Sequence, residues 1–129
     1  MNSLFTIQEV VRQTGVSAHA LRYYEKAGLL RDVGRHPNGW RFYTRSNIEW
    51  INILMILRST GMSIRKIRSL DALRRQGAQS IAARIEFFTA YRQDIVAQIH
   101  ARRRAVKVID VKIARHQRML EQLKIKERK

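Results

Sequence analysis

Glycine and proline are distributed unevenly along this chain of 129 residues, and that distribution constrains the fold more than any other feature. All six glycines and the only proline lie within residues 1–77, whereas residues 78–129 contain neither. Because glycine and proline mark turns and helix ends, frequent turns are expected only in the first segment. We therefore predict a domain of short elements over residues 1–77 and one long helix over residues 78–129.

The long helix carries an apolar seam, defined as the positions reached from Ile85 in alternating steps of three and four residues. The seam positions are Ile85, Phe88, Arg92, Ile95, Ile99, Arg102, Val106, Ile109, Ile113, His116, Leu120 and Leu123. All but three are apolar, a heptad pattern typical of a coiled coil. A helix from Ser80 to about Lys124 would be roughly 65 Å long at ~1.5 Å per residue, which the first domain cannot cover. The seam therefore predicts a two-fold homodimer.

The seam divides into residues expected to pair and residues that interrupt the pattern. The predicted dimerisation residues are Phe88, Ile95, Ile99, Val106, Ile109, Ile113 and Leu120. The three polar seam residues, Arg92, Arg102 and His116, leave three interpretations open. They could extend outward into solvent, set the register of pairing, or mark where pairing stops.

Two short helices are predicted near the N-terminus. Thr6 followed by Glu9 fits a capping box at the start of the first helix, and Gly15 ends that helix. Ser17 is expected to cap a second helix from Ala18 to about Lys26. Two short helices joined by a turn that contains glycine form a helix-turn-helix pattern, which is weak evidence alone because many helical domains contain such a pair.

A β-hairpin is predicted directly after the second helix. Residues 36–39 indicate a turn between extended segments, and the aromatic residues that follow are typical of a strand. We expect Trp40 and Phe42 to pack onto the domain, and Arg41, which alternates with them, to face outward. Thr44 or Ser46 is expected to cap a third helix.

That third helix is expected to end at Gly61. Ser63 caps a fourth, which is expected to end at Gly77. The first domain therefore contains four helices and one hairpin, and the chain as a whole is mainly α.

The charge of the chain favours a polyanionic partner. Lys and Arg number 26 against 10 Asp and Glu, a net charge of +16, which suits nucleic acid or an anionic membrane surface. No apolar run approaches the ~20 residues that span a bilayer. The N-terminus has neither the basic start nor the apolar stretch of a signal peptide, so we expect a soluble intracellular protein without membrane association.

The motifs of enzymes and metal sites are missing from the sequence. The absence of cysteine excludes disulfides, thiolate metal sites and cysteine nucleophiles. There is no glycine-rich phosphate loop, zinc-ligand spacing or triad-like set of residues. His100 and His116 lie too far apart along the long helix to share a metal. We predict that the chain is not an enzyme and holds no metal and no cofactor.

Several short segments, taken in order and spacing, resemble the MerR family of bacterial transcriptional regulators from about residue 4 to residue 75. The segments are IQEV at 7–10, TGV at 14–16, LRYYE at 21–25, GLL at 28–30, WRFY at 40–43 and GMSIRKI at 61–67. The run from Leu21 to Leu30 is the most specific of them. The long C-terminal helix also stands where that family has its antiparallel dimerisation coiled coil. Residues 109–113 are similar to the short, aldehyde-response-like branch.

The resemblance implies a winged helix-turn-helix domain with a small β-hairpin wing, followed by the dimerisation helix. It implies a homodimer that binds a pseudo-palindromic site in double-stranded promoter DNA and distorts that DNA, so that RNA polymerase can read both promoter elements. Such a regulator acts in the bacterial cytoplasm, in association with the nucleoid. Cysteine-based metal, redox or aldehyde sensing does not fit a chain without cysteine, and the inducing signal stays unidentified.

Candidate DNA-binding residues come from the second helix, the wing and the start of the fourth helix. They are Ser17, His19, Arg22, Tyr23, Tyr24, Arg35, His36, Arg41, Tyr43, Arg45, Ser63, Arg65 and Lys66. Arg22 is expected to read guanine or grip a phosphate. Of Tyr23 and Tyr24, which cannot share one helix face, one should bond a phosphate while the other packs inward. The start of the fourth helix should bind phosphate through its free N–H groups.

Two other functions remain open at this point. An architectural protein would compact DNA with strong salt dependence and little sequence preference. A coiled-coil module would bind an acidic protein or a membrane surface through its basic face. The aromatic residues Phe87, Phe88 and Tyr91 could line a small ligand pocket, although packing within a core also explains them.

Overall fold

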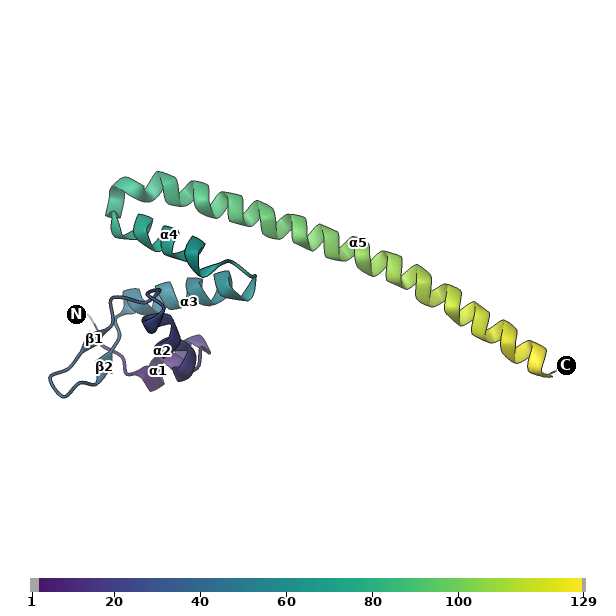
Figure 1. Cartoon of the computed structure of the whole chain (residues 1–129), viewed down its shortest axis with the longest axis horizontal. Helices are drawn as coiled ribbons and strands as arrows, with labels where there is room; N and C mark the ends of the chain where they lie inside the picture. The colour runs from purple at the N-terminus through teal and green to yellow at the C-terminus, as the bar shows by residue number, and fades with distance from the viewer. Residues whose placement is uncertain (1–2, 129) are drawn as a thin grey trace. The chain divides into compact units, whose positions relative to one another are not determined.

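The computed structural model describes residues 3–128, and Figure 1 shows their helices and strands. The chain divides into two compact units between Ile85 and Glu86. The elements are α1 (Ile7–Thr14), α2 (Ala18–Lys26), β1 (Gly34–Arg35), β2 (Arg41–Phe42), α3 (Arg45–Ser59), α4 (Ile64–Arg75), the 3-10 helix η1 (Gly77–Ser80) and α5 (Ile81–Arg128). The predicted mainly helical class, with one hairpin and a long C-terminal helix, is confirmed. The functional division after residue 77 stays a prediction.

The predicted helix-turn-helix forms as the capping residues dictate. The Thr6 hydroxyl accepts from the Glu9 backbone N–H and the Glu9 carboxylate accepts from the Thr6 N–H, which completes the capping box of α1. Gly15 follows α1 with φ of 75°, a left-handed conformation that favours glycine. Ser17 then caps α2 by accepting from the backbone N–H of Ala20.

The hairpin pairs β1 with β2 in antiparallel fashion, with Gly34 opposite Phe42. A Cβ atom at Gly34 would lie 2.1 Å from the Phe42 ring, so only glycine fits there. Phe5 and Tyr43 extend the pairing by two backbone hydrogen bonds of 2.8 and 2.9 Å, which tie the N-terminal segment to the hairpin. The sequence did not indicate this third extended segment.

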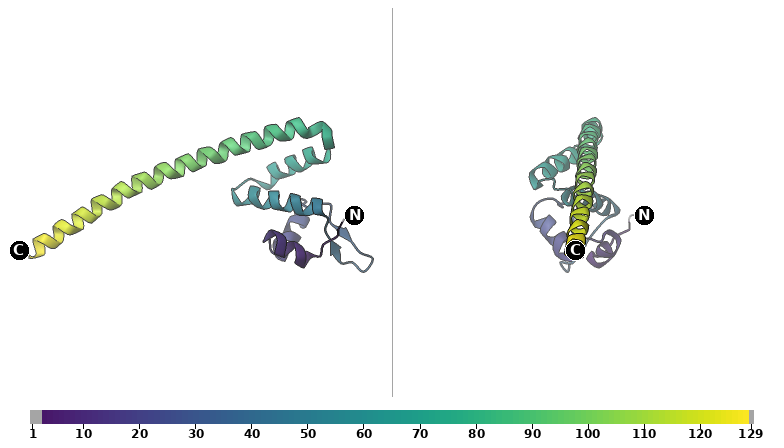
Figure 2. Two further views of the ribbon diagram at one scale, coloured as in Figure 1. Left: turned by 180° about the vertical axis from the view of Figure 1, so that it is seen from behind. Right: turned by 90° about the vertical axis from the view of Figure 1, so that its right-hand side faces the viewer.

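The two longer helices of the first unit, α3 and α4, lie side by side (Figures 1 and 2). Thr44 caps α3, rather than the alternative Ser46, and forms a second capping box with Asn47. Ser63 caps α4 as predicted. Helix α4 ends at Arg75 with Gln76 as its C-cap, and Gly77 follows in the left-handed conformation with φ of 74°, so the predicted stop at Gly77 is confirmed; the chain then continues into η1.

The core of the first unit draws apolar side chains from every helix and from the loop after α2. The fully buried apolar residues include Val10, Leu21, Leu29, Leu30, Ile51, Leu54, Leu57, Ile67 and Leu70. Trp50 on α3 is also buried, and its indole N–H donates to the Leu29 backbone oxygen at 2.7 Å. This hydrogen bond fixes the chain leaving α2 against α3.

A buried carboxylate joins α4 to the loop after α2. Asp71 is 0% exposed and forms ion pairs with Arg31 at 3.3 Å, Arg74 at 2.8 Å and Arg75 at 3.1 Å. Asp32 adds a second carboxylate at 3.0 Å from Arg75. Because a buried charge needs partners, Asp71 holds the loop residue Arg31, and Asp32 of the same loop pairs with Arg74 and Arg75, so these ion pairs tie α4 to the loop.

The second unit consists of residues 86–128 of α5, and none of them is buried. The helix runs somewhat beyond the predicted end near Lys124, to Arg128. Large apolar side chains of the seam are exposed along it, among them Ile99, Val106, Ile109 and Leu120. A helix with this much exposed apolar surface has a face suited to another chain.

The described part of the chain has neither a helix suited to cross a membrane nor a cluster of side chains suited to hold a metal. No helix among residues 3–128 has the length and hydropathy needed to cross a membrane. Within the same range, no group of three or more His, Asp or Glu side chains could hold a metal ion.

Candidate nucleic-acid interface

The outer face of α2 carries four of the predicted DNA-binding residues. Ser17, His19, Arg22 and Tyr23 are all exposed, while Leu21 on the opposite side is fully buried. Positions 19, 22 and 23 are three and four residues apart, so they share one face of the helix. Arg22 makes no hydrogen bond or ion pair with the residues that the structure describes. Its guanidinium group is thus available to an external acceptor.

The two tyrosines of α2 occupy different environments. Tyr23 is 47% exposed, whereas Tyr24 is half-buried, and their ring centroids lie 6.0 Å apart with the rings tilted by 58°. Tyr24 is therefore the tyrosine that packs inward. Tyr23 is the one whose hydroxyl faces solvent on the same side as Arg22.

Glu25 of α2 connects the helix to the wing, a role that the sequence analysis missed. Its Oε2 accepts a hydrogen bond of 2.7 Å from Nε of Arg41, and its Oε1 lies 3.5 Å from Nη2 of Arg35. Arg35 also donates from Nη1 to the Gly39 carbonyl at 3.0 Å, which braces the hairpin turn. Both wing arginines are therefore held against the C-terminal part of α2. The sequence feature that could have indicated this role is the glutamate in LRYYE, whose negative charge is opposite to that of the two wing arginines.

The wing aromatics pack differently from the prediction. Trp40 is 72% exposed, so the expectation that it packs onto the domain is wrong. Trp40 directly precedes β2 at the hairpin turn, where its backbone N–H donates to the Asn38 side chain at 3.0 Å. Phe42 does pack, since it is half-buried and its ring lies 4.7 Å from that of His36. The turn thus presents an indole to solvent.

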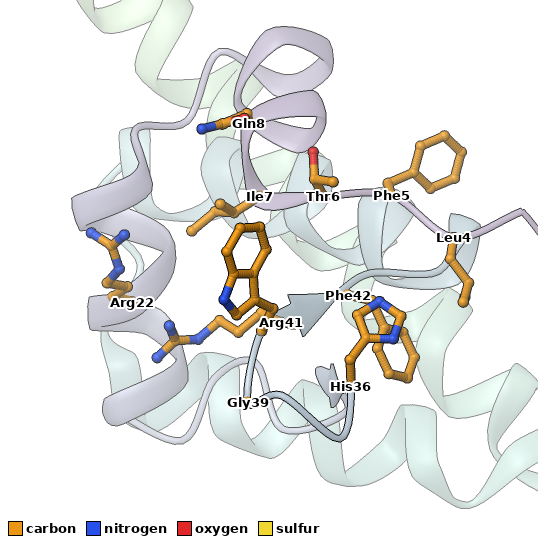
Figure 3. A pocket seen from close by; sticks show the side chains of 11 residues that line it. Leu4, Phe5, Thr6, Ile7, Gln8, Arg22, His36, Gly39, Arg41 and Phe42 are labelled. Carbon is orange, nitrogen blue, oxygen red and sulfur yellow. The ribbon is translucent and has the colours of Figure 1, made fainter.

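A hollow of about 360 Å³ lies between the N-terminal segment, the wing and α2 (Figure 3). Its lining is mostly apolar and includes Ile7, Trp40 and Phe42. Arg22 from α2 and Arg41 from β2 lie on the same side of this hollow. The arrangement places Arg22, which has no hydrogen-bond or ion-pair partner among residues 3–128, beside an apolar recess where α2 meets the wing.

Tyr43 is part of the core rather than of the surface. The residue is 0% exposed, and its hydroxyl has no hydrogen-bond partner among the described residues. Burial raises the pKa of Tyr43 above its usual range, and the negative charge of Glu25 raises it further. The predicted phosphate contact of Tyr43 conflicts with this burial, because its hydroxyl does not reach the surface.

The remaining candidates lie at exposed positions. Arg45 at the start of α3 is exposed, and its guanidinium carbon lies 5.0 Å from the centre of the Phe5 ring. The Ser63 hydroxyl accepts from the backbone N–H of Lys66 at 3.1 Å, so it is used as a helix cap. Arg65 and Lys66 are exposed in the first turn of α4.

Comparison with known proteins gives a consistent result. Residues 5–73 match the family described as MerR HTH family regulatory protein. An uncharacterised HTH-type transcriptional regulator of Haemophilus influenzae is 31% identical over 114 residues, which cover 88% of this chain and 84% of that protein. The HTH-type transcriptional regulator AdhR of Bacillus subtilis is 33% identical over 90 residues, covering 70% of this chain and 64% of that protein.

Solved structures agree with the sequence matches. This chain is similar to HiNmlR, a MerR family regulator lacking the sensor domain, whose crystal structure was solved bound to promoter DNA. Its TM-score is 0.79 at 30% identity, covering 89% of this chain and 87% of that one. A MerR family regulator from Listeria monocytogenes gives a TM-score of 0.76 at 28% identity, covering 95% and 98%. With its capped helix-turn-helix, its wing and these matches, the chain belongs to the MerR family of transcriptional regulators.

Proposed function

We propose that this chain binds a pseudo-palindromic site in double-stranded promoter DNA as a homodimer and distorts the DNA to control initiation by RNA polymerase. The observation that carries the proposal is the exposed face of α2, on which Arg22 makes no hydrogen bond or ion pair with described residues. The similar regulator HiNmlR is bound to promoter DNA in its crystal structure. The protein would act in the bacterial cytoplasm, at the nucleoid.

In this proposal α2 enters the major groove. A side chain that reads bases must be exposed on the helix and unpaired in the unbound protein, and Arg22 meets both conditions. Arginine donates two hydrogen bonds to the O6 and N7 atoms of guanine, a pairing that discriminates by ~1–3 kcal/mol. His19 and Tyr23 flank Arg22 on the same face and would add contacts to bases or phosphates.

The wing and α4 would contact the DNA backbone. Arg35, His36 and Trp40 are exposed at the hairpin turn. Arg65 and Lys66 flank the N-terminal end of α4, where backbone N–H groups and the helix dipole favour a phosphate. Such contacts position the protein without reading sequence. They would also supply energy to deform the promoter.

The homodimer would form through the seam of α5. Ile99, Val106, Ile109 and Ile113 are exposed in the single chain, and each loses contact with water when a second helix covers the seam. Two recognition helices related by a two-fold axis would match a site with pseudo-palindromic halves.

The deciding experiment measures the affinity of Arg22→Ala for a promoter site recovered by selection on genomic DNA, at about 150 mM salt. We expect the variant to lose about 5- to 150-fold in affinity for this site, the equivalent of one bidentate guanine contact. Its affinity for random DNA should change far less, because one charge of many is removed. Far-UV circular dichroism would check the fold.

Arg118→Ala is the matched control, since Arg118 is an exposed arginine of α5 outside the seam. It removes the same charge and should leave specific binding nearly unchanged. Equal losses on specific and random DNA in Arg22→Ala would contradict base reading. A wild-type protein without sequence preference would favour the architectural function instead.

A further inference from the structure

Two of the three polar residues of the seam, Arg92 and His116, are placed symmetrically about its middle. The seam runs from Ile85 to Leu123, and Arg104 lies halfway between them. Arg92 and His116 are equally far from Arg104, one on each side. When two copies of the helix pair antiparallel about this midpoint, Arg92 of each copy therefore lies opposite His116 of the other.

This alignment pairs every seam residue with one of like polarity except Arg102, which lies opposite Val106. It pairs Ile85 with Leu123, Phe88 with Leu120, and Ile95 with Ile113, so that apolar positions meet apolar positions. A parallel alignment in register would place Arg92 against Arg92 and Arg102 against Arg102, two layers of like charge. An antiparallel shift by one heptad would place Arg92 opposite Ile109 or Leu123, which leaves a charge in an apolar layer.

The side-chain chemistry of the pair is complementary. Nδ1 of His116 lies 2.9 Å from the carbonyl oxygen of Lys112, one turn earlier on α5. Because a carbonyl only accepts, Nδ1 carries the proton there and Nε2 is left as an acceptor. The Arg92 guanidinium has five N–H donors and no acceptor. Arg92 opposite His116 can therefore donate a hydrogen bond to Nε2, the ring nitrogen that is left as an acceptor.

The surface around His116 has the form of a hole for a partner side chain. A shallow, almost wholly apolar hollow of about 300 Å³ is lined by Ile109, Lys112, Ile113, His116, Gln117 and Leu120. These residues are spaced as the positions that surround a knob in a coiled coil. The symmetric alignment brings Arg92 and Ile95 of the second copy to this hollow, where Ile95 fills the apolar part.

We propose that Arg92 of one copy and His116 of the second form two polar layers in an antiparallel coiled coil, and that these layers set its register. The inference rests on the proposed homodimer. Polar residues at single seam positions specify register in coiled coils at some cost in stability. Arg102 lies opposite Val106 next to the midpoint, where its long apolar stem covers the valine and its charge reaches solvent.

Cysteine cross-linking tests the register cleanly, because the natural chain contains no cysteine. Ile99→Cys and Ile109→Cys are co-expressed as full chains with two different affinity tags, and dimers that carry both tags are oxidised. The symmetric register places these two positions opposite each other, so a disulfide-linked heterodimer should form in high yield. Either variant alone should not cross-link to itself.

Two control pairs report the neighbouring registers. Ile99→Cys with Arg102→Cys should link only after a shift of one heptad in one direction, and Val106→Cys with Ile109→Cys only after the opposite shift. Dominant linking of either control pair, self-linking of a single variant, or a dimer that links no pair would overturn the proposed register. Sedimentation of the wild-type chain as a monomer would overturn the homodimer itself. Failure of the proposed homodimer is therefore distinguishable from failure of the proposed register.

A second measurement asks whether the polar layers cause the register. In the Arg92→Leu and His116→Leu double variant the seam is apolar at both positions. A shifted register then no longer places Arg92 or His116 in an apolar layer, so it no longer loses stability for that reason. We expect cross-linking of the control pairs to rise about tenfold while the dimer persists. The matched control is Arg118→Leu with His100→Leu, which removes the same residue types outside the seam. Unchanged control-pair yields in the first double variant would overturn the assignment of the register to Arg92 and His116.

Discussion

Glu25 of α2 accepts a 2.7 Å hydrogen bond from Nε of Arg41 of β2, and this pair joins α2 to the wing. The carboxylate also lies 3.5 Å from the Arg35 guanidinium, so one acidic side chain holds both arginines of the hairpin. One negative charge on α2 therefore links the helix to both arginines of the hairpin.

Replacing that charge should weaken DNA binding more than it weakens the fold. In Glu25→Gln we expect specific affinity to fall about tenfold, because the wing loses its fixed position relative to α2. Unfolding free energy should fall by only about 1 kcal/mol, since the pair is partly exposed to solvent. Titration with the selected promoter site and urea denaturation measure the two effects. Glu49→Gln on α3 is the control, an exposed glutamate in no ion pair among the described residues. Equal affinity of both variants would contradict the coupling of helix and wing.

Asp71 should be the most sensitive charged position for stability. Asp71→Asn keeps the size of the side chain but removes the charge that three arginines share. We expect a loss of about 2–3 kcal/mol in unfolding free energy, toward the low end for a broken buried pair because the arginines are partly exposed. Guanidinium chloride denaturation measures this loss. The exposed Asp94→Asn on α5 serves as control and should change stability by less than ~0.5 kcal/mol. Similar values for the two variants would show that the cluster does not hold α4.

The two tryptophans offer a direct test of which surface meets DNA. Trp40 is 72% exposed and Trp50 is 5% exposed, so acrylamide should quench the fluorescence of Trp40 far more strongly. In Trp50→Phe, where Trp40 is the remaining tryptophan, binding of the promoter site should reduce quenching several-fold, because DNA covers the wing. In Trp40→Phe the signal of Trp50 should stay weakly quenched with and without DNA. Undiminished quenching of bound Trp40 would place the wing tip away from the DNA.

Local sequence rules predicted much of this fold, because caps and glycines act over three or four residues. Thr6, Ser17 and Ser63 cap the helices predicted for them, and Gly15 ends α1. Non-local relationships were less accessible. The pairing of Phe5 with Tyr43, and the burial of Trp50 against Leu29, join segments far apart in the chain, and no local pattern encodes them.

In the candidate site, too, local features were predicted from the sequence and non-local contacts were not. Exposure of Arg22 was expected from the sequence and is observed, whereas the choice between Tyr23 and Tyr24 was left open, and only the structure shows that Tyr23 is the exposed one. Strand alternation failed for Trp40, since β2 contains only two residues and the turn before it sets the orientation of Trp40. The role of Glu25 depended on where the hairpin folds back, and that placement appears only in three dimensions.

The sharing of Glu25 by two arginines also affects how ionic strength governs binding. Together Glu25, Arg35 and Arg41 carry one net positive charge, although the wing sequence suggests two. A duplex releases condensed counterions in proportion to the phosphates that a protein neutralises. The wing would therefore release fewer ions than its arginine content implies, and the slope of log affinity against log salt would be shallower than two unpaired wing arginines would give.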